Sequence, residues 1–325
     1  MRAVRLREYG PPEVLVQEEL PDPLPGVGQV VVEVAAIGVN FADTMLRSGL
    51  MASATRPRPP FIPGNEVGGV VSAVGEGVDP GMLSRRVITG TGGTGGYAER
   101  VAVAADGVFP VPEGLNIETA VALFAQGRTA VGVAREARIA PGDRVLVEAA
   151  AGGVGSLLVQ IARNAGAGMV IAAARGTHKL VLAQRLGADV TVDYGRADWA
   201  DRVSDATGGD GIDVAFDSVG GIIGRAAFDL LAGAGRFVVF GFSSGMPVDV
   251  NVAEVQRRGV TVVGFGPPRV CRPGYAHSLV SEALAEAAAG RLIPVIGQTF
   301  PLDQAAAAHA AIEARATMGK TLLIP

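Results

Sequence analysis

The stretch Val145–Gly166, VLVEAAAGGVGSLLVQIARNAG, decides the fold of the middle of the chain. Its pattern predicts an apolar strand that ends at Glu148, a turn of small residues, and a helix that begins near Gly153. The turn matches the dinucleotide-binding fingerprint Gly-x-Gly-x-x-Gly, with alanine in the first slot. Glycine here lets the backbone approach a pyrophosphate, and the free N–H groups of the helix N-terminus favour the anion. The stretch therefore predicts a dinucleotide site formed by Ala150, Gly152, Gly153, Val154 and Gly155.

The next predicted strand distinguishes between the two nicotinamide dinucleotides. A site for NAD(H) usually has an acidic residue at the end of this strand, where it binds the ribose 2′-hydroxyl. Here the sequence is MVIAAARGTHK (Met169–Lys179), which has no acid and places Arg175 at that position, with Lys179 shortly after it. Cationic side chains suit a 2′-phosphate, so the strand favours NADPH as the cofactor. Tyr194 ends the third strand and is a candidate for stacking on the adenine.

The pattern of the whole chain predicts two kinds of domain. Strand and helix patterns alternate from residue 117 to residue 264, which is typical of a doubly wound parallel sheet. Before them come short β runs, such as residues 67–74 and 97–103, between turns rich in proline and glycine. Gly127 predicts a break in the helix pattern of residues 117–137. A mixed pattern returns after residue 264, so we expect the tail to rejoin the first domain.

Composition excludes several classes of protein. The 325 residues are 49% hydrophobic and 18% charged, with a net charge of -4 and a single cysteine. A large core is therefore expected, and neither a general nucleic-acid binder nor a membrane-surface binder fits this charge. One cysteine permits no internal disulfide and no cysteine-based zinc cluster. We see no run of transmembrane length and no signal peptide, so we expect a cytoplasmic protein without a membrane partner.

Six stretches carry a resemblance to a known family. They are GVNFADTMLRSGLM (38–51), PGNEVGGVVSAVGEGV (63–78), AQGRTAV (125–131), PGDRVLVEAAAGGVGS (141–156), RLGADVTVDY (185–194) and MGKTLLIP (318–325). Together they resemble the medium-chain dehydrogenase/reductase superfamily and, within it, the zinc-free quinone oxidoreductase (zeta-crystallin-like) branch. The resemblance runs from Met1 to Pro325. It implies a GroES-like β-rich catalytic domain at residues 1–121 and 267–325, an inserted Rossmann domain at residues 122–266, and a site in the cleft between them.

The resemblance also implies a site without metal. Zinc members of the superfamily have a cysteine ligand in the first stretch and a His-Glu pair in the second. In this sequence Asn40 and Asn65 stand in those slots, and the histidines lie far apart. Without a Lewis acid to hold an alkoxide, alcohol dehydrogenation is disfavoured. Asn65 and Glu66 are then interpreted mainly as structural polar residues.

The resemblance assigns further site residues. Asn40 resembles the family residue near the nicotinamide ribose and the substrate. Many relatives carry a tyrosine just after the NFxD stretch, where this chain has Thr44 and Met45, so Asp43 and Thr44 are the remaining catalytic candidates. Six more residues resemble those that line the cofactor in the family, and for each of them a turn or packing role stays open: Gln126, Gly241, Phe242, Phe265, Gly266 and Lys320.

Three functions remain open on the sequence. The first is an NADPH-dependent reductase of quinones, which need no strong protein acid because their reduced oxygens take protons from solvent. The second is an NADPH-dependent ene-reductase of α,β-unsaturated ketones or enoyl thioesters, whose enolate benefits from a nearby proton donor. The third is a low-turnover NADPH-binding protein with a structural or nucleic-acid-binding role. We also expect a homodimer that pairs through the apolar edge strand at residues 260–264.

Overall fold

The computed structural model describes residues 1–51, 57–270, 272 and 274–325, and the chain folds into two compact units. Unit 1 comprises Met1–Ala125 and Pro294–Pro325, and unit 2 comprises Gln126–Ile293. Unit 2 is thus inserted into unit 1. Among the described helices, none is long and apolar enough to cross a membrane.

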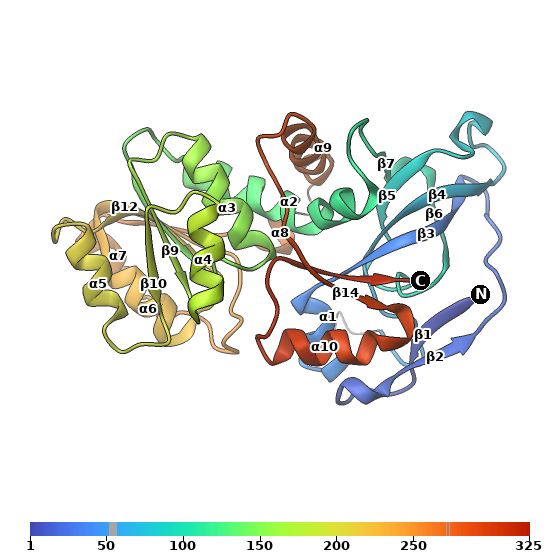
Figure 1. Ribbon diagram of the computed structural model, residues 1–325, viewed down its shortest axis with the longest axis horizontal. Helices are drawn as coiled ribbons and strands as arrows, with labels where there is room; N and C mark the ends of the chain where they lie inside the picture. The colour runs from blue at the N-terminus through green and yellow to red at the C-terminus, as the bar shows by residue number, and fades with distance from the viewer. Residues whose placement is uncertain (52–56, 271, 273) are drawn as a thin grey trace. The chain divides into compact units, whose positions relative to one another are not determined.

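Unit 2 contains a parallel sheet of six strands with helices in the connections (Figure 1). The strands are β8 (Arg144–Glu148), β9 (Met169–Ala174), β10 (Val190–Asp193), β11 (Ile212–Asp217), β12 (Leu231–Val239) and β13 (Thr261–Gly264). The helices are α3 (Gly153–Asn164), α4 (Thr177–Arg185), α5 (Trp199–Ala206), α6 (Gly221–Asp229), α7 (Val252–Arg258), α8 (Pro267–Val270) and α9 (Tyr275–Ala288). The strand order is β10-β9-β8-β11-β12-β13, and every pair is parallel. This is the Rossmann order. The order in which the strands follow one another along the chain reverses between β8 and β11, and this leaves a crevice at the carboxyl ends of these two strands.

Unit 1 contains a mixed sheet of seven strands and a separate two-stranded sheet. Its strands are β1 (Arg2–Leu6), β2 (Leu15–Glu19), β3 (Gln29–Val39), β4 (Glu66–Val74), β5 (Arg86–Gly90), β6 (Arg100–Ala104), β7 (Val108–Pro110), β14 (Ile296–Pro301) and β15 (Lys320–Ile324). Its helices are α1 (Phe41–Ser48) and α10 (Ala305–Glu313). The tail strand β15 pairs with β3, so the end of the chain returns to the first sheet as the sequence predicts. Unit 1 is the GroES-like domain, and unit 2 is the Rossmann domain.

Helix α2 (Ile117–Ala137) corrects one sequence expectation. The predicted break at Gly127 is absent. Gly127 is buried, and the helix continues through it without interruption. Burial of the apolar side of a helix outweighs the cost of one glycine, which is about 1 kcal/mol.

The structure also divides the chain differently from the expected boundaries of 121 and 267. Residues 122–125 belong to unit 1, and residues 267–293 belong to unit 2. The second difference has a clear cause, since α9 packs on α2. Arg135 of α2 forms an ion pair with Glu282 of α9, and Leu279 lies next to Gly132. The helix signal in the tail did not reveal this partner.

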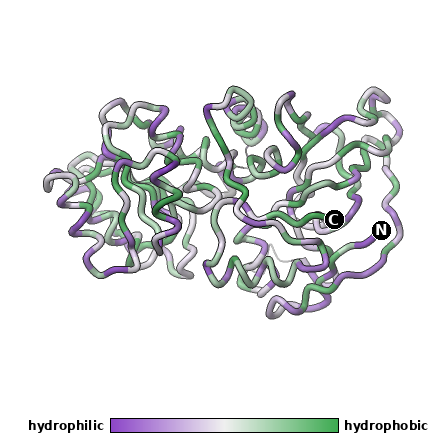
Figure 2. The backbone as a smooth tube through the Cα atoms, in the orientation of Figure 1, coloured by the Kyte–Doolittle hydropathy of each residue, from purple (hydrophilic) through white to green (hydrophobic). Residues whose placement is uncertain are grey.

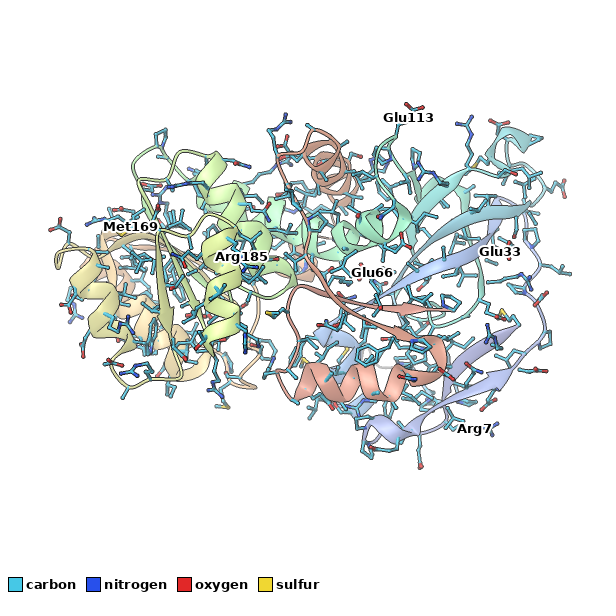
Figure 3. The ribbon with its side chains drawn as sticks, in the orientation of Figure 1. Arg7, Glu33, Glu66, Glu113, Met169 and Arg185 are labelled. Carbon is cyan, nitrogen blue, oxygen red and sulfur yellow. The ribbon has the colours of Figure 1, made fainter. Side chains whose placement is uncertain are left out.

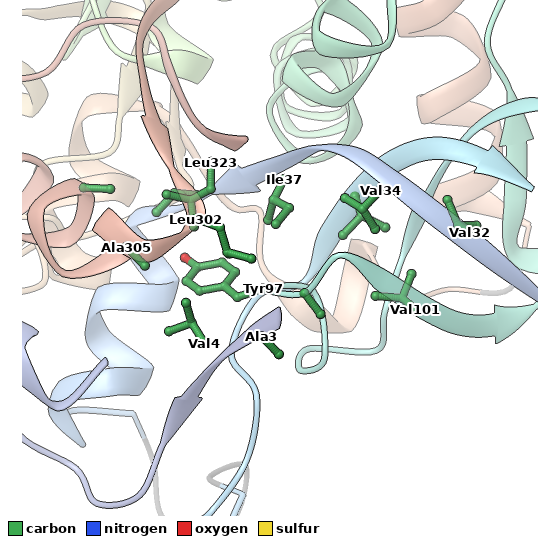
Figure 4. Close-up of a cluster of buried hydrophobic side chains, with 14 of the residues drawn as sticks. Ala3, Val4, Val32, Val34, Ile37, Tyr97, Val101, Leu302, Ala305 and Leu323 are labelled. Carbon is green, nitrogen blue, oxygen red and sulfur yellow. The ribbon is translucent and has the colours of Figure 1, made fainter. Parts of the chain in front are cut away.

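Each unit has its own core. In unit 2 the parallel strands are the most hydrophobic segments, while the surrounding helices and loops are more polar (Figure 2). In unit 1 the ring of Tyr97 lies among the side chains of Val4, Leu302 and Ala305 (Figure 4). Residues that are distant in sequence therefore meet around one aromatic ring, which ties the first strand and the C-terminal helix to the GroES-like sheet.

Candidate functional site

A buried polar cluster in unit 1 joins Asn40, Glu66 and Lys320. The Nζ atom of Lys320 forms an ion pair with Oε1 of Glu66 and lies 3.0 Å from Oδ1 of Asn40. The Nδ2 atom of Asn40 donates to Oε1 of Glu66 over 2.9 Å. The side chains of Glu66 and Lys320 are 0% and 1% exposed. A buried charge is costly without a partner, so each of these two groups depends on the other.

The backbone makes room for this cluster. Glu66 begins β4 (Figure 3) and pairs with Gly38 of β3, where any side chain would overlap the Glu66 carboxylate. The second carboxylate oxygen accepts the backbone N–H of Ala125 in α2 over 2.9 Å. The missing side chain at Gly38 therefore leaves the space that the Glu66 carboxylate fills. The sequence interpretation treated Glu66 as a structural residue but did not include this contact.

Helix α1 positions Asn40, Asp43 and Thr44. Asn40 precedes the helix, and its backbone N–H donates to Oδ2 of Asp43 over 2.8 Å, as in a helix cap. The helix ends at Gly49, whose left-handed conformation suits glycine. The Thr44 hydroxyl donates to the carbonyl of Phe41 over 2.8 Å, and both Asp43 and Thr44 are buried. Asp43 and Thr44 thus hold the turn that carries Asn40.

Burial raises the pKa of Asp43 to about 6, and the negative charge of Glu66 adds to this effect. The backbone hydrogen bond from Asn40 acts in the opposite direction and favours the carboxylate. Asp43 therefore changes its charge close to pH 6, nearer to neutrality than an ordinary aspartate does.

Tyr97, His309 and Arg47 form a second buried cluster that sequence reasoning missed. The Tyr97 hydroxyl lies 2.8 Å from Nε2 of His309, and Arg47 forms an ion pair with Glu313. Burial and the charge of Arg47 lower the pKa of His309 to about 3, so the imidazole is neutral. Burial raises the pKa of Tyr97 well above its usual value, and the charges of Asp43 and Glu66 contribute. Only the fold brings these residues together, because α10 supplies the histidine.

In unit 2 the glycine turn has the geometry of a phosphate cradle. Gly152 is the cap residue before α3, whose first-turn N–H groups lie at the carboxyl end of β8. A side chain at Gly155 would overlap the backbone of Ala149 and Ala150, so the helix packs closely on the turn. Gln126 lies against Gly153. The cap at Gly152 and the close packing at Gly155 are what a dinucleotide fingerprint requires, and the turn therefore fits a pyrophosphate.

The ends of β9 and β10 bring the predicted ribose-binding residues together. Ala174 and Asp193 are paired, and the exposed Arg175 and the half-buried Tyr194 directly follow them. Lys179 lies in the first turn of α4. The Asp193 carboxylate accepts the backbone N–H groups of Gly176 and Gly195 over 3.1 Å and 2.8 Å, so this acid is engaged by its own loops.

The other predicted cofactor residues lie in different surroundings. Phe242 follows β12 and is 47% exposed, and Gly241 packs on Ser218 at the end of β11. Phe265 is buried against Gly132 of α2, and Gly266 begins the turn into α8. The structure places Lys320 in unit 1, where its amine holds Asn40 and Glu66.

Comparison with known proteins gives the family. The model of the alcohol dehydrogenase GroES-like domain matches residues 26–113, and that of the zinc-binding dehydrogenases matches residues 153–275. A quinone oxidoreductase of Sus scrofa is 32% identical over 327 residues, which cover 100% of this chain and 98% of that protein. The chain belongs to the quinone oxidoreductase branch of the medium-chain dehydrogenase/reductase superfamily.

Further relatives support this quinone oxidoreductase membership. A 2-haloacrylate reductase from Burkholderia sp is 34% identical over 335 residues, which cover 99% of this chain and 98% of that protein. The crystal structure of Escherichia coli quinone oxidoreductase complexed with NADPH matches with a TM-score of 0.90 and 32% identity over 100% of both chains. As a member of this branch the chain is an oxidoreductase, and the resemblance read from the sequence is confirmed.

The residues of this chain do not fit the zinc ion that one family description implies. The slots of the zinc ligands hold Asn40 and Asn65, whose amides are poor zinc ligands beside cysteine and histidine. The adjacent Glu66 is bound to the Lys320 ammonium, which would repel a second cation. Across the described residues, no three His, Cys, Asp or Glu side chains are grouped as a metal site would require.

Proposed function

We propose that the chain is an NADPH-dependent, zinc-independent oxidoreductase that reduces quinones. The observation that supports it most is the glycine turn of unit 2 followed by cationic residues, Arg175 and Lys179, at the strand end where NAD(H) sites carry an acid. The relatives named quinone oxidoreductase, one of them crystallised with NADPH, point the same way.

In this proposal the cofactor supplies a hydride, and the protein binds and orients it. The N–H groups at the start of α3 bind the pyrophosphate, and Arg175 and Lys179 bind the 2′-phosphate. The loops after β11 and β12, with Ser218 and Gly241, border the crevice. Gln126, next to the glycine turn, and Gly266 are further lining candidates. The buried side chain of Phe265 leaves only its backbone for such a contact.

Unit 1 contributes the amide of Asn40. Because Oδ1 accepts from Lys320 and one N–H goes to Glu66, the orientation of the amide is fixed. We propose that the Asn40 side chain, held in this orientation, meets the cofactor ribose or the substrate. Asp43 and Thr44 position it through α1, and a quinone takes its protons from solvent, so no protein acid has to reach the acceptor.

The second candidate is an ene-reductase, and the 34% identity to a 2-haloacrylate reductase favours it. Reduction of a conjugated alkene leaves a carbanion-like carbon that needs a proton. Asp43 and Thr44 are buried within unit 1, so on this reading the donor is solvent or a further residue.

The test is NADPH consumption by purified, chelator-treated protein with benzoquinone or with a 2-haloacrylate, followed by absorbance. Turnover with the quinone alone supports the quinone reductase, and turnover with the haloacrylate alone replaces it by the ene-reductase. Tight NADPH binding without turnover on either acceptor would favour the third function, a low-turnover NADPH-binding protein. Zinc in stoichiometric amount by elemental analysis of the active protein would contradict zinc independence.

A further inference from the structure

Two carboxyl groups meet in the interior of unit 2. Glu148 is the last residue of β8, and Asp217 is the last residue of the neighbouring β11. Val147 and Phe216 are paired, so the next residues lie side by side and their side chains point to the same face of the sheet. Adjacent strands are about 4.8 Å apart, which brings the two carboxyl groups within reach of each other.

These carboxyl groups lack the partners that buried charges need. Both side chains are fully buried, and neither forms an ion pair with a described residue. Oδ1 of Asp217 accepts the N–H groups of Val219 and Gly220 over 2.9 Å and 2.7 Å. Oδ2 of Asp217 and both oxygens of Glu148 have no hydrogen-bond partner among the described residues. Two adjacent carboxylates cannot both be ionised at such a place, and one proton between them removes the conflict.

The position of the pair links it to the crevice. The order of the strands along the chain reverses between β8 and β11. Glu148 and Asp217 therefore lie at the point where the two halves of the sheet diverge. Glu148 runs directly into the glycine turn, and Asp217 runs into the loop of Ser218–Gly220 that leads to α6. Gly224 of α6 packs on the Asp217 carboxyl group, where a larger side chain would displace it.

We propose that Glu148 and Asp217 share one proton, and that this hydrogen bond fixes the Ser218–Gly220 loop against the glycine turn. Glu148 donates through its protonated carboxyl group, and Asp217 accepts while it also holds the two backbone N–H groups. Both are positioning residues. The consequence for cofactor affinity rests on the proposed binding of NADPH in the crevice, whereas the shared proton itself does not.

The surroundings of Glu148 support a protonated form. Burial raises the pKa of Glu148 well above its usual value, and the charge of Asp217 raises it further. The backbone N–H groups of Val219 and Ser218 lie close enough to lower the pKa, although neither forms a hydrogen bond to Glu148, and their effect is outweighed. From β9 the paired neighbour of Glu148 is Ala173, from β12 the neighbour of Asp217 is Val239, and α6 presents Gly224, so these elements bring no charge to the pair. Raising the pH until this proton leaves creates two adjacent negative charges, which repel and free the loop.

Infrared spectroscopy of the cofactor-free protein tests the shared proton. At about pH 8, where ordinary carboxyl groups are ionised, the wild-type protein should show the C=O band of a buried protonated carboxyl group. The band should vanish in Glu148→Gln. Asp43→Asn is the matched control, because Asp43 has a raised pKa but should be ionised at that pH, so the band should persist. A wild-type spectrum identical to that of Glu148→Gln in this region would overturn the proposal.

Hydrogen exchange tests the loop without cofactor. The amides of Val219 and Gly220, corrected for intrinsic exchange, should lose protection at the alkaline pH at which the infrared band disappears. In Glu148→Gln the neutral amide donates to Asp217 at every pH, so protection should stay constant. Loss of protection at the same pH in both proteins would refute the coupling.

Binding of NADPH provides the functional readout. In the wild type, the Kd of NADPH should rise at least tenfold across the alkaline transition, because the loss of a hydrogen bond to a charged group has an effect of that size. In Glu148→Gln, the Kd of NADPH should change less than about twofold across the same pH range. Equal pH dependence in both proteins would show that the pair does not control the crevice. If no NADPH binds at all, the proposed cofactor is wrong, and the infrared and exchange measurements still decide whether the proton is shared.

Discussion

At the scale of single residues, Lys320 is the cation that balances the buried Glu66. In Lys320→Met the Glu66 carboxylate loses its ion pair inside unit 1, so we expect the free energy of unfolding to fall by about 3–5 kcal/mol. Glu66→Gln combined with Lys320→Met should recover much of this loss, because no buried charge is then left alone. Urea unfolding of the two variants and the wild type measures both effects. Equal stability of the single and double variants would show that the pair is not coupled.

In the proposed function, we expect Arg175 to decide the choice of dinucleotide. Arg175→Ala removes a cation from the end of β9, so the Kd of NADPH should rise roughly tenfold to a hundredfold, as expected for a lost bond to a charged group. The Kd of NADH should hardly change, because NADH has no 2′-phosphate. Arg185→Ala is the matched control, since Arg185 is also exposed and lies at the far end of α4, the helix that follows Arg175 (Figure 3). Fluorescence titration of the wild type and both variants gives all six constants, and parallel losses for both dinucleotides in Arg175→Ala would contradict the role of Arg175.

At the scale of elements, β13 is one of the two edge strands of the Rossmann sheet, and β10 is the other. Strand β13 pairs only with β12 in the described chain, and its Val262 is 39% exposed. An unpaired apolar edge is a template for a second strand, so we expect two copies to join there. Val262→Glu should shift a dimer towards monomer in light scattering at micromolar concentration. Val181→Glu, at a site 41% exposed on α4, should not. A monomeric wild type would remove the prediction altogether.

How much the sequence predicted also depends on the element. The phosphate cradle follows from one continuous stretch, because a strand, a turn and a helix that are adjacent in sequence form it. The cluster of Asn40, Glu66 and Lys320 comes from three elements far apart in the chain, and no local pattern carries that information. The pairing of Tyr97 with His309 was missed for the same reason. The resemblance named Asn40 and Lys320, but only the fold shows that they touch.

At the scale of the whole molecule, His309 makes stability sensitive to acid. Its folded-state pKa is about 3, below the ordinary value of 6.5, so in this range the unfolded chain binds a proton that the folded chain excludes. Stability is therefore lost as the pH falls through the ordinary value. His309→Gln keeps a partner for Tyr97 and cannot become charged. Between about pH 6.5 and about pH 5, the wild type should lose about 1.6 kcal/mol more than this variant, because the slope approaches about 1.4 kcal/mol per pH unit only below the ordinary pKa. Chemical unfolding at both pH values checks this, and parallel losses would show that another group is responsible.

The scarcity of lysine has a practical consequence. Reagents directed at primary amines find only Lys179, Lys320 and the amino group of Met1. Lys320 is sealed inside unit 1, and the Met1 amine is engaged by the carbonyl of Leu20 and by Asp22. Lys179 is the more accessible lysine, so coupling of the folded protein to an activated resin or a dye should concentrate there. Molecules immobilised in this way would share one orientation. If Lys179 binds NADPH as proposed, saturating NADPH during coupling should protect the attachment point.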